Sequence, residues 1–272
     1  MKFVKCYICL YSAFFRVKEV KNLKKWLTKK IIVIFIIGLL ISVIYIIKNK
    51  MQDKKQNEIF EELENIVTEK QDEDREQQEE SINLQELYEL NNDFLGWIKI
   101  EDTNISYPVM QTDSNRKDYY LRKNFYKEYS QLGTPYIAEY CNVQTSDNVI
   151  IYGHHITDYQ VFGELEKYKK KEFYDNHKVI NFNTIYGNAD YEIISVFKTV
   201  THTGFKYYEF INSSSQDEFD TFIKKCKELS FYEIKETANY GDKLLTLSTC
   251  EYSTKNGRLV VVARKITSEL EE

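Results

Sequence analysis

The chain has 272 residues, of which 43% are hydrophobic and 29% are charged, so it is long enough to bury one sizeable core. Its net charge is −5, and because residues 1–30 carry +8, residues 31–272 carry −13. An acidic main part without a basic aromatic patch argues against nucleic acid as a partner.

The longest uncharged run, residues 31–47, predicts a single transmembrane helix. Its seventeen residues are nearly all aliphatic or aromatic, which is close to the lower length limit for crossing a bilayer. Lys and Arg are denser before the run than after it, so the positive-inside rule places the N-terminus in the cytoplasm. A buried helix or strand and a cleaved signal peptide are the alternatives, but lysines flank the run on both sides and no small-residue cleavage site follows it.

The composition after this run predicts a stalk followed by a globular domain. Residues 48–80 are dense in Glu, Asp, Lys and Gln, with a few apolar residues at helical spacing. We therefore expect a cytoplasmic basic segment (1–30), a transmembrane helix (31–47), a charged stalk (48–80) and an extracellular globular domain (81–272).

The globular part contains many short runs with strand character. After a short helix near residues 84–90, these runs lie at residues 94–100, 105–110, 136–138, 148–152, 179–182, 190–197, 244–249 and 259–263. One further helix is expected within residues 213–231, where Ser215 and Glu218 form a candidate capping box. Many short strands with one inserted helix predict a mainly β, closed or nearly closed barrel.

Cys250 ends one predicted strand, and Arg258 begins the next. Asn256 and Gly257 between them are a strong turn signal, so the two strands are expected to be antiparallel neighbours. The thiol and the guanidinium would then lie side by side, where the fixed positive charge favours a thiolate. The alternative is a cysteine that packs as a small hydrophobe beside a surface arginine.

The other cysteines are weaker candidates for chemistry. Outside the membrane in this topology lie Cys141, Cys226 and Cys250, so at least one thiol is unpaired in a monomer. Cys226 lies on the apolar face of the expected helix and is assigned to the core. Cys6 and Cys9 have metal-ligand spacing but no second pair, so a zinc site there has little support.

His154 and His155 follow a predicted strand directly after Gly153 and are the candidate acid–base residues. At the end of a strand, either ring could point into a groove, and a solvent-exposed loop histidine is the alternative. Adjacent side chains on an extended chain point apart, so the two rings are poorly placed to ligate one metal ion, and we expect no metal or cofactor.

The sequence Thr-Leu-Ser-Thr-Cys at residues 246–250, followed by Arg258, resembles the signature of sortases. Further motifs resemble class B members in particular, and they lie at residues 93–100, 107–109, 119–121 and 152–155. The similarity covers roughly residues 83–266. It implies a sortase-type β-barrel of about eight strands with N-terminal helices. It also implies a membrane-anchored cysteine transpeptidase that joins surface proteins to the cell wall of Gram-positive bacteria.

The resemblance also implies a role for each candidate residue. Cys250 would attack a threonine carbonyl and form a thioester. His154, directly after glycine, matches the family position of the general acid and base. Arg258 would hold the substrate backbone or stabilise the oxyanion. On an alternating strand, Ser248 faces the same side as Cys250 and is a candidate groove residue, with a buried hydroxyl in the barrel interior as the alternative.

The implied partners are surface proteins with a C-terminal sorting signal that resembles NPxTN or PxTG. The acceptor would be an amine of the peptidoglycan cross-bridge or of lipid II. Two other functions stay open on the residues alone: a membrane-tethered cysteine endopeptidase that uses water as acceptor, and a non-catalytic barrel that binds wall polymers.

Overall fold

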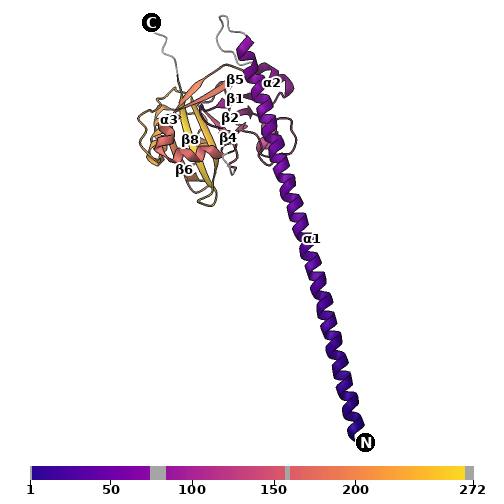
Figure 1. Cartoon of the computed structure of the whole chain (residues 1–272). Coiled ribbons are helices and arrows are strands. Elements are labelled where there is room, and N and C mark those ends of the chain that lie inside the picture. Colours follow the sequence, from indigo (N-terminus) through magenta and orange to yellow (C-terminus); the bar gives the residue numbers. More distant parts are fainter. Residues whose placement is uncertain (1, 74–83, 157–159, 267–272) are drawn as a thin grey trace, which may run out of the picture. The chain divides into compact units, whose positions relative to one another are not determined.

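The computed structural model describes residues 2–73, 84–156 and 160–266, and it divides the chain into two compact units, Met1–Gln52 and Asp53–Glu272. Helix α1 (Lys2–Glu73) supplies the first unit and also enters the second (Figure 1). Its part Trp26–Thr68 holds the one apolar helix among the described residues that is long enough to cross a membrane. The expected transmembrane run, residues 31–47, lies within this part, and all of its side chains are exposed.

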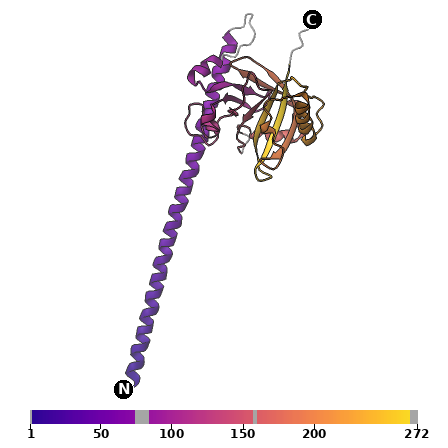
Figure 2. The same cartoon turned by 180° about the vertical axis from the view of Figure 1, so that it is seen from behind.

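The second unit is a closed barrel of eight strands, which confirms the expected fold class (Figures 1 and 2). The order around the barrel is β1-β2-β3-β4-β7-β8-β6-β5. The strands are β1 (Phe94–Lys99), β2 (Ser106–Met110), β3 (Tyr136–Ile137), β4 (Asn148–Tyr152), β5 (Val179–Thr184), β6 (Asp190–Val200), β7 (Leu244–Glu251) and β8 (Gly257–Lys265). The pairs β2–β3 and β4–β7 are parallel, and the other pairs between neighbouring strands are antiparallel.

Strand β7 is buried over almost its whole length, with only Cys250 partly exposed. Burial on both faces of a strand means that the sheet is covered on both sides, as its nearly continuous apolar and β-branched sequence requires. Residues Leu245, Leu247 and Val261, on β7 and its neighbour β8, are fully buried. The strand that carries the candidate nucleophile is therefore packed in the core of the barrel up to the position of Cys250.

Helix α4 (Gln216–Leu229) packs against β6 and is the helix expected within residues 213–231. The hydroxyl of Ser215 accepts the Glu218 N–H at 3.3 Å, as in a capping box. The Glu218 carboxylate, however, accepts from the N–H and hydroxyl of Ser214, one residue earlier than expected. Two shorter helices are α2 (Leu84–Leu90), which was expected, and α3 (Lys171–Asn176), where the charged residues before His177 have helical character in the sequence.

The last part of α1 belongs to the folded unit, and Figures 1 and 2 both show it beside α2 and the first strands. Its carboxylate Glu64 accepts a hydrogen bond of 2.7 Å from Ser106, which accepts one of 3.0 Å from the Trp97 indole. Its buried apolar side chains are Ile59, Phe60, Leu63 and Val67.

The domain boundary expected at residue 81 therefore differs from that of the compact unit, which begins at Asp53. The few apolar residues at helical spacing in the expected stalk are core residues, and the charged residues around them cover the exposed face of the helix. The rest of the expected stalk, residues 74–80, lies outside the described residues.

We predict that Leu63→Ala lowers the free energy of unfolding of the second unit by about 2–5 kcal/mol, because Leu63 is fully buried and its loss leaves a cavity. Glu61→Ala, two residues earlier on the exposed face, is the control and should change stability by less than about 0.5 kcal/mol. Chemical denaturation of the full chain in detergent measures both. Equal effects of the two substitutions would show that this part of α1 is not core.

Candidate active site

The hairpin of β7 and β8 brings Cys250 and Arg258 together as direct cross-strand partners. The turn between them places Asn256 at φ 59°, and the Gly257 N–H bonds to the Thr254 carbonyl at 3.0 Å. A Cβ at Gly257 would lie 2.4 Å from the Glu251 carbonyl oxygen, so only glycine fits there. The thiol and the guanidinium therefore start from neighbouring backbone positions, as the turn signal predicted.

Cys250 is the one partly exposed thiol among the cysteines whose side chains the structure describes. Cys141 and Cys226 are buried, and burial raises the pKa of the Cys141 thiol to about 11. Burial raises the pKa of the Cys226 thiol still further. Both buried thiols stay protonated at neutral pH, which leaves Cys250 as the accessible candidate nucleophile among the described cysteines.

The parallel pairing of β4 with β7 brings the histidines to the same end of the barrel. Tyr152 pairs with Ser248, and the Gly153 N–H continues this ladder to the Ser248 carbonyl at 3.1 Å. His154 lies two residues beyond Tyr152, and Cys250 lies two residues beyond Ser248. Because the strands are parallel, both residues leave the ladder at the same edge.

The ring of His154 is held by the backbone of a neighbouring 3₁₀ helix, η2 (Tyr119–Arg122). Its Nε2 lies 2.8 Å from the Leu121 carbonyl oxygen, which can only accept, so Nε2 carries the hydrogen. Burial lowers the pKa of His154 below its ordinary value. The Leu121 hydrogen bond opposes this shift, and the charge of Arg122 adds to it. The protonated form of His154 is therefore a stronger acid than the imidazolium of an ordinary exposed histidine.

The neighbouring ring, that of His155, contacts the backbone of Cys250. Its Nδ1 lies 2.8 Å from the Cys250 carbonyl oxygen, and the ring packs edge-to-face on Tyr252. Sequence reasoning offered His155 only as the alternative to His154. Its contact with Cys250 depends on the β4–β7 pairing, for which the local sequence gives no signal.

Ser248 does not line an open surface, contrary to its selection as a groove residue. It is 1% exposed, and its hydroxyl lies 2.5 Å from the hydroxyl of Tyr207, on the 3₁₀ helix η5 (Tyr207–Glu209). The alternative of a buried hydroxyl fits this environment, with a tyrosine side chain rather than the backbone as its partner.

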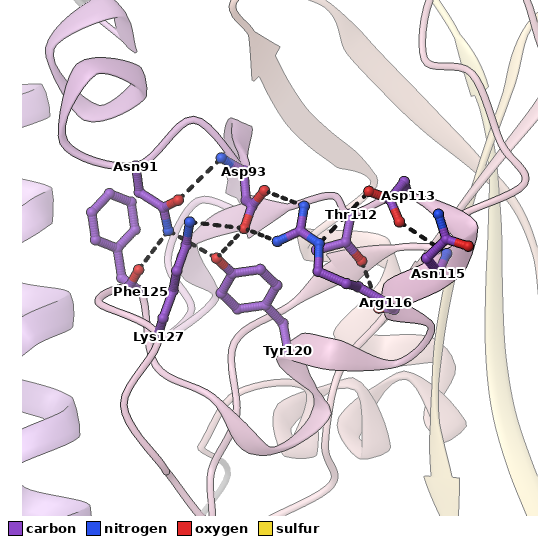
Figure 3. Close-up of polar contacts among 9 residues, drawn as sticks. All are labelled: Asn91, Asp93, Thr112, Asp113, Asn115, Arg116, Tyr120, Phe125 and Lys127. Carbon is purple, nitrogen blue, oxygen red and sulfur yellow. Dashed lines mark hydrogen bonds and ion pairs between the residues drawn. The ribbon is translucent and has the colours of Figure 1, made fainter.

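A buried carboxylate, Asp93, anchors the loops that carry η2 (Figure 3). Both nitrogens of the Arg116 fork donate to it at 2.8 Å, and the Tyr120 hydroxyl donates at 3.0 Å. The Lys127 ammonium lies 3.1 Å away, and the Asn91 amide donates to the Tyr120 hydroxyl. Burial alone would raise the pKa of Asp93, but the bonds from Arg116, Lys127 and Tyr120 bring it below its ordinary value.

This cluster is linked to His154 through two consecutive residues of η2. Tyr120, which bonds to Asp93, precedes Leu121, whose carbonyl accepts from His154. The cluster therefore helps to fix where the His154 ring lies. The motif at residues 93–100 includes Asp93, but sequence reasoning assigned its carboxylate no role, since its partners lie more than twenty residues further along the chain.

We predict that Asp93→Asn destabilises the fold by about 1–3 kcal/mol at pH 7, because asparagine is neutral and keeps only one of the two oxygens that face Arg116 and Lys127. The pKa of Asp93 is lower in the folded state than its unfolded value of about 3.9. The Asp93 carboxylate therefore stabilises the fold fully above that unfolded value, and this stabilisation is lost as the pH falls through the folded pKa. Denaturation of both proteins at pH 7 and near pH 3 should show the difference shrinking.

The matched control for this prediction is Asp113→Asn. Asp113 is exposed, lies 3.7 Å from the same Arg116 side chain, and accepts from the Asn115 N–H, which an asparagine can also do. We expect a change of less than about 0.5 kcal/mol. An undiminished Asp93→Asn effect at low pH would contradict the electrostatic account.

The chain is similar to known proteins over most of its length. The model of the Sortase domain family matches residues 98–266. Sortase B of Staphylococcus aureus (strain NCTC 8325 / PS 47) is 31% identical over 253 residues, which cover 90% of this chain and 98% of that protein. Sortase B of Listeria monocytogenes serovar 1/2a is 33% identical over 188 residues, 68% of this chain and 74% of that protein.

Solved structures agree with these sequence relatives. A Staphylococcus aureus sortase B–substrate complex superposes with a TM-score of 0.72 at 30% identity, over 80% of this chain and all of that chain. A sortase B complexed with triglycine gives a TM-score of 0.71 at 30% identity, again over 80% of this chain and all of that chain.

Proposed function

Because this chain belongs to the sortase family and to its class B, whose members are cysteine transpeptidases that anchor surface proteins, we propose that Cys250, His154 and Arg258 carry out the transfer. The observation that carries the proposal is the meeting of three segments at one barrel edge. These are the partly exposed end of β7, its hairpin partner on β8, and the end of β4.

In the first half of the reaction, the Cys250 thiolate attacks the carbonyl carbon of a threonine in the sorting signal. A bond forms between sulfur and carbon, the peptide C–N bond breaks, and the leaving amine takes a proton from the imidazolium of His154. The lowered pKa of His154 makes its imidazolium a stronger acid, which suits this transfer. The products are a thioester and a neutral ring.

In the second half, an acceptor amine attacks the thioester carbon. His154 takes the amine's proton, a new amide bond forms, and Cys250 leaves as a thiolate, so both groups return to their starting states. A solved sortase B complexed with triglycine supports a short glycine peptide as a probe for this acceptor.

Arg258 is suited to the negative charge that develops on the carbonyl oxygen. Its Nη1 donates to the Gly257 carbonyl at 2.9 Å, which orients the guanidinium and leaves further N–H donors for the substrate. A donor that stabilises an oxyanion contributes about 10²–10³ in rate.

We also propose the orientation and the partners expected from the sequence. The apolar part of α1 would anchor the chain, with residues 1–30 in the cytoplasm and the barrel outside. Digestion of the barrel by protease added to intact cells tests this orientation, and protection of the barrel contradicts it. The sorting signal would resemble NPxTN or PxTG, and the acceptor would be a peptidoglycan or lipid II amine. A panel of signal peptides tests the substrate class, and cleavage of none of them contradicts it.

We predict that Cys250→Ala abolishes cleavage of a sorting-signal peptide and its transfer to triglycine. Cys141→Ala is the control and should keep the rate within a few-fold, because that thiol is buried and protonated. Product analysis by mass spectrometry distinguishes transfer from hydrolysis. Turnover by Cys250→Ala would reject the nucleophile, and cleavage without capture by triglycine would favour an endopeptidase.

We predict that Arg258→Lys lowers kcat/KM by about 10²–10³, because lysine keeps the charge but loses the planar fork. Arg264→Lys on the same strand is the matched control, since Arg264 pairs with Glu192 at 3.2 Å and should tolerate the change. Steady-state peptide cleavage measures both variants. A parental rate for Arg258→Lys would remove the geometric role.

A further inference from the structure

We propose that His155 is a positioning residue that holds Cys250 in place. Strand β4 ends before it reaches Cys250, and the His155 ring makes the hydrogen bond to the Cys250 carbonyl that a longer β4 would make. This inference rests on the proposed role of Cys250. It assigns His155 a task separate from that of the acid–base residue His154.

The β4–β7 ladder ends two residues before Cys250. The last pair is Tyr152 with Ser248, and the Ser248 carbonyl accepts from the Gly153 N–H. Successive carbonyls of a strand alternate in direction, so the Cys250 carbonyl points to the same side as that of Ser248. No backbone N–H of β4, a strand described over its whole length, reaches it, and the Nδ1 of His155 supplies the hydrogen bond instead, at 2.8 Å.

The direction of this hydrogen bond fixes the chemistry of the ring. The carbonyl oxygen of Cys250 can only accept, so Nδ1 of His155 carries the hydrogen. A carboxylate oxygen of Glu166 lies 3.4 Å from the same Nδ1 and favours this tautomer. Only 16% of the His155 side chain is exposed. The Nδ1–H is therefore committed to the backbone of the nucleophile.

Two ion pairs connect His155 to the residue that follows Cys250. Glu166 pairs with Lys169 at 2.5 Å, and Lys169 pairs with the buried Glu251 at 2.7 Å. Glu251 directly follows Cys250 in the chain. The connection thus runs from Cys250 through His155, Glu166 and Lys169 to Glu251 and back along the chain. Glu166 and Lys169 both lie on the 3₁₀ helix η4 (Gly163–Lys169), which therefore contacts the imidazole of His155 on one side.

Tyr252 fastens the other side of His155. Its hydroxyl donates to the His155 carbonyl at 3.1 Å, and the two rings meet edge-to-face with centroids 5.1 Å apart. The segment after β4 and the end of β7 are therefore joined by two hydrogen bonds and one aromatic contact. Without the His155 ring, Cys250 would be supported by its neighbour strand β8 alone.

The consequence for the reaction is geometric. A displacement of the thiol by about 1 Å relative to its partners can cost about 10²-fold in rate. We expect His155→Ala to lower kcat by about 10–100-fold and to change KM by less than about threefold. The rate of alkylation of Cys250 by iodoacetamide should stay within about threefold, because His155 does not take the thiol's proton.

A pair of amide variants tests the hydrogen bond itself. The Nδ2 of asparagine reaches about the position of the histidine Nδ1, whereas the amide of glutamine reaches about that of Nε2. We therefore expect His155→Asn to keep kcat within about fivefold of the parent, and His155→Gln to resemble His155→Ala. His177→Ala is the matched control, because the Nδ1 of His177 makes the same kind of bond to the Phe173 carbonyl at 2.7 Å.

All variants are measured as the full chain, with thermal melting alongside peptide cleavage. A parental kcat for His155→Ala, or an asparagine variant as slow as the glutamine variant, would overturn the proposal. If His155→Ala does not fold, the comparison of asparagine with glutamine decides. A large loss of alkylation in His155→Ala would also overturn it, because the ring would then govern thiol ionisation. Failure of the proposed function is separate, since it appears as turnover by Cys250→Ala.

Discussion

The parallel pairing of β4 with β7 is the constraint on which the site depends. The two strands lie almost a hundred residues apart in the chain, yet their shared register makes them end at the same edge of the barrel. Cys250 leaves one strand there, and His154 and His155 leave the other. The β7–β8 hairpin then adds Arg258 by a purely local connection. One long-range pairing and one tight turn are enough to assemble the three chemical groups.

Backbone carbonyls orient both histidine rings at this edge. His154 donates to Leu121 and His155 donates to Cys250, each at 2.8 Å, so the adjacent residues take separate directions and separate partners. The first contact depends on η2, which the Asp93 cluster holds against the start of β1 (Figure 3). The second contact depends on β7, the strand that carries Cys250. Polar clusters around the buried carboxylates Asp93 and Glu251 thus hold the segments on which His154 and Cys250 lie.

Local signals in the sequence predict much of this structure. Short apolar runs predict the strands, and Asn256 with Gly257 predicts the hairpin that joins Cys250 to Arg258. Contacts between distant segments have no such signal. The burial of Leu63 within the expected charged stalk, the Tyr207 hydroxyl on Ser248 and the Asp93 cluster all depend on which segments meet after folding. The boundary at residue 81 and the choice of Ser248 as a groove residue differ from the structure for this reason.

The distribution of thiols has a consequence for how the protein meets oxidants. Among the cysteines with described side chains, Cys141 and Cys226 are 5% and 0% exposed and protonated at neutral pH, so oxidative damage falls on Cys250. A sulfenic acid formed there finds neither of these buried thiols ready to condense with it. Neither of these two thiols can therefore form a disulfide with an oxidised Cys250, so among the described cysteines its recovery as a thiol depends on a reductant from solution.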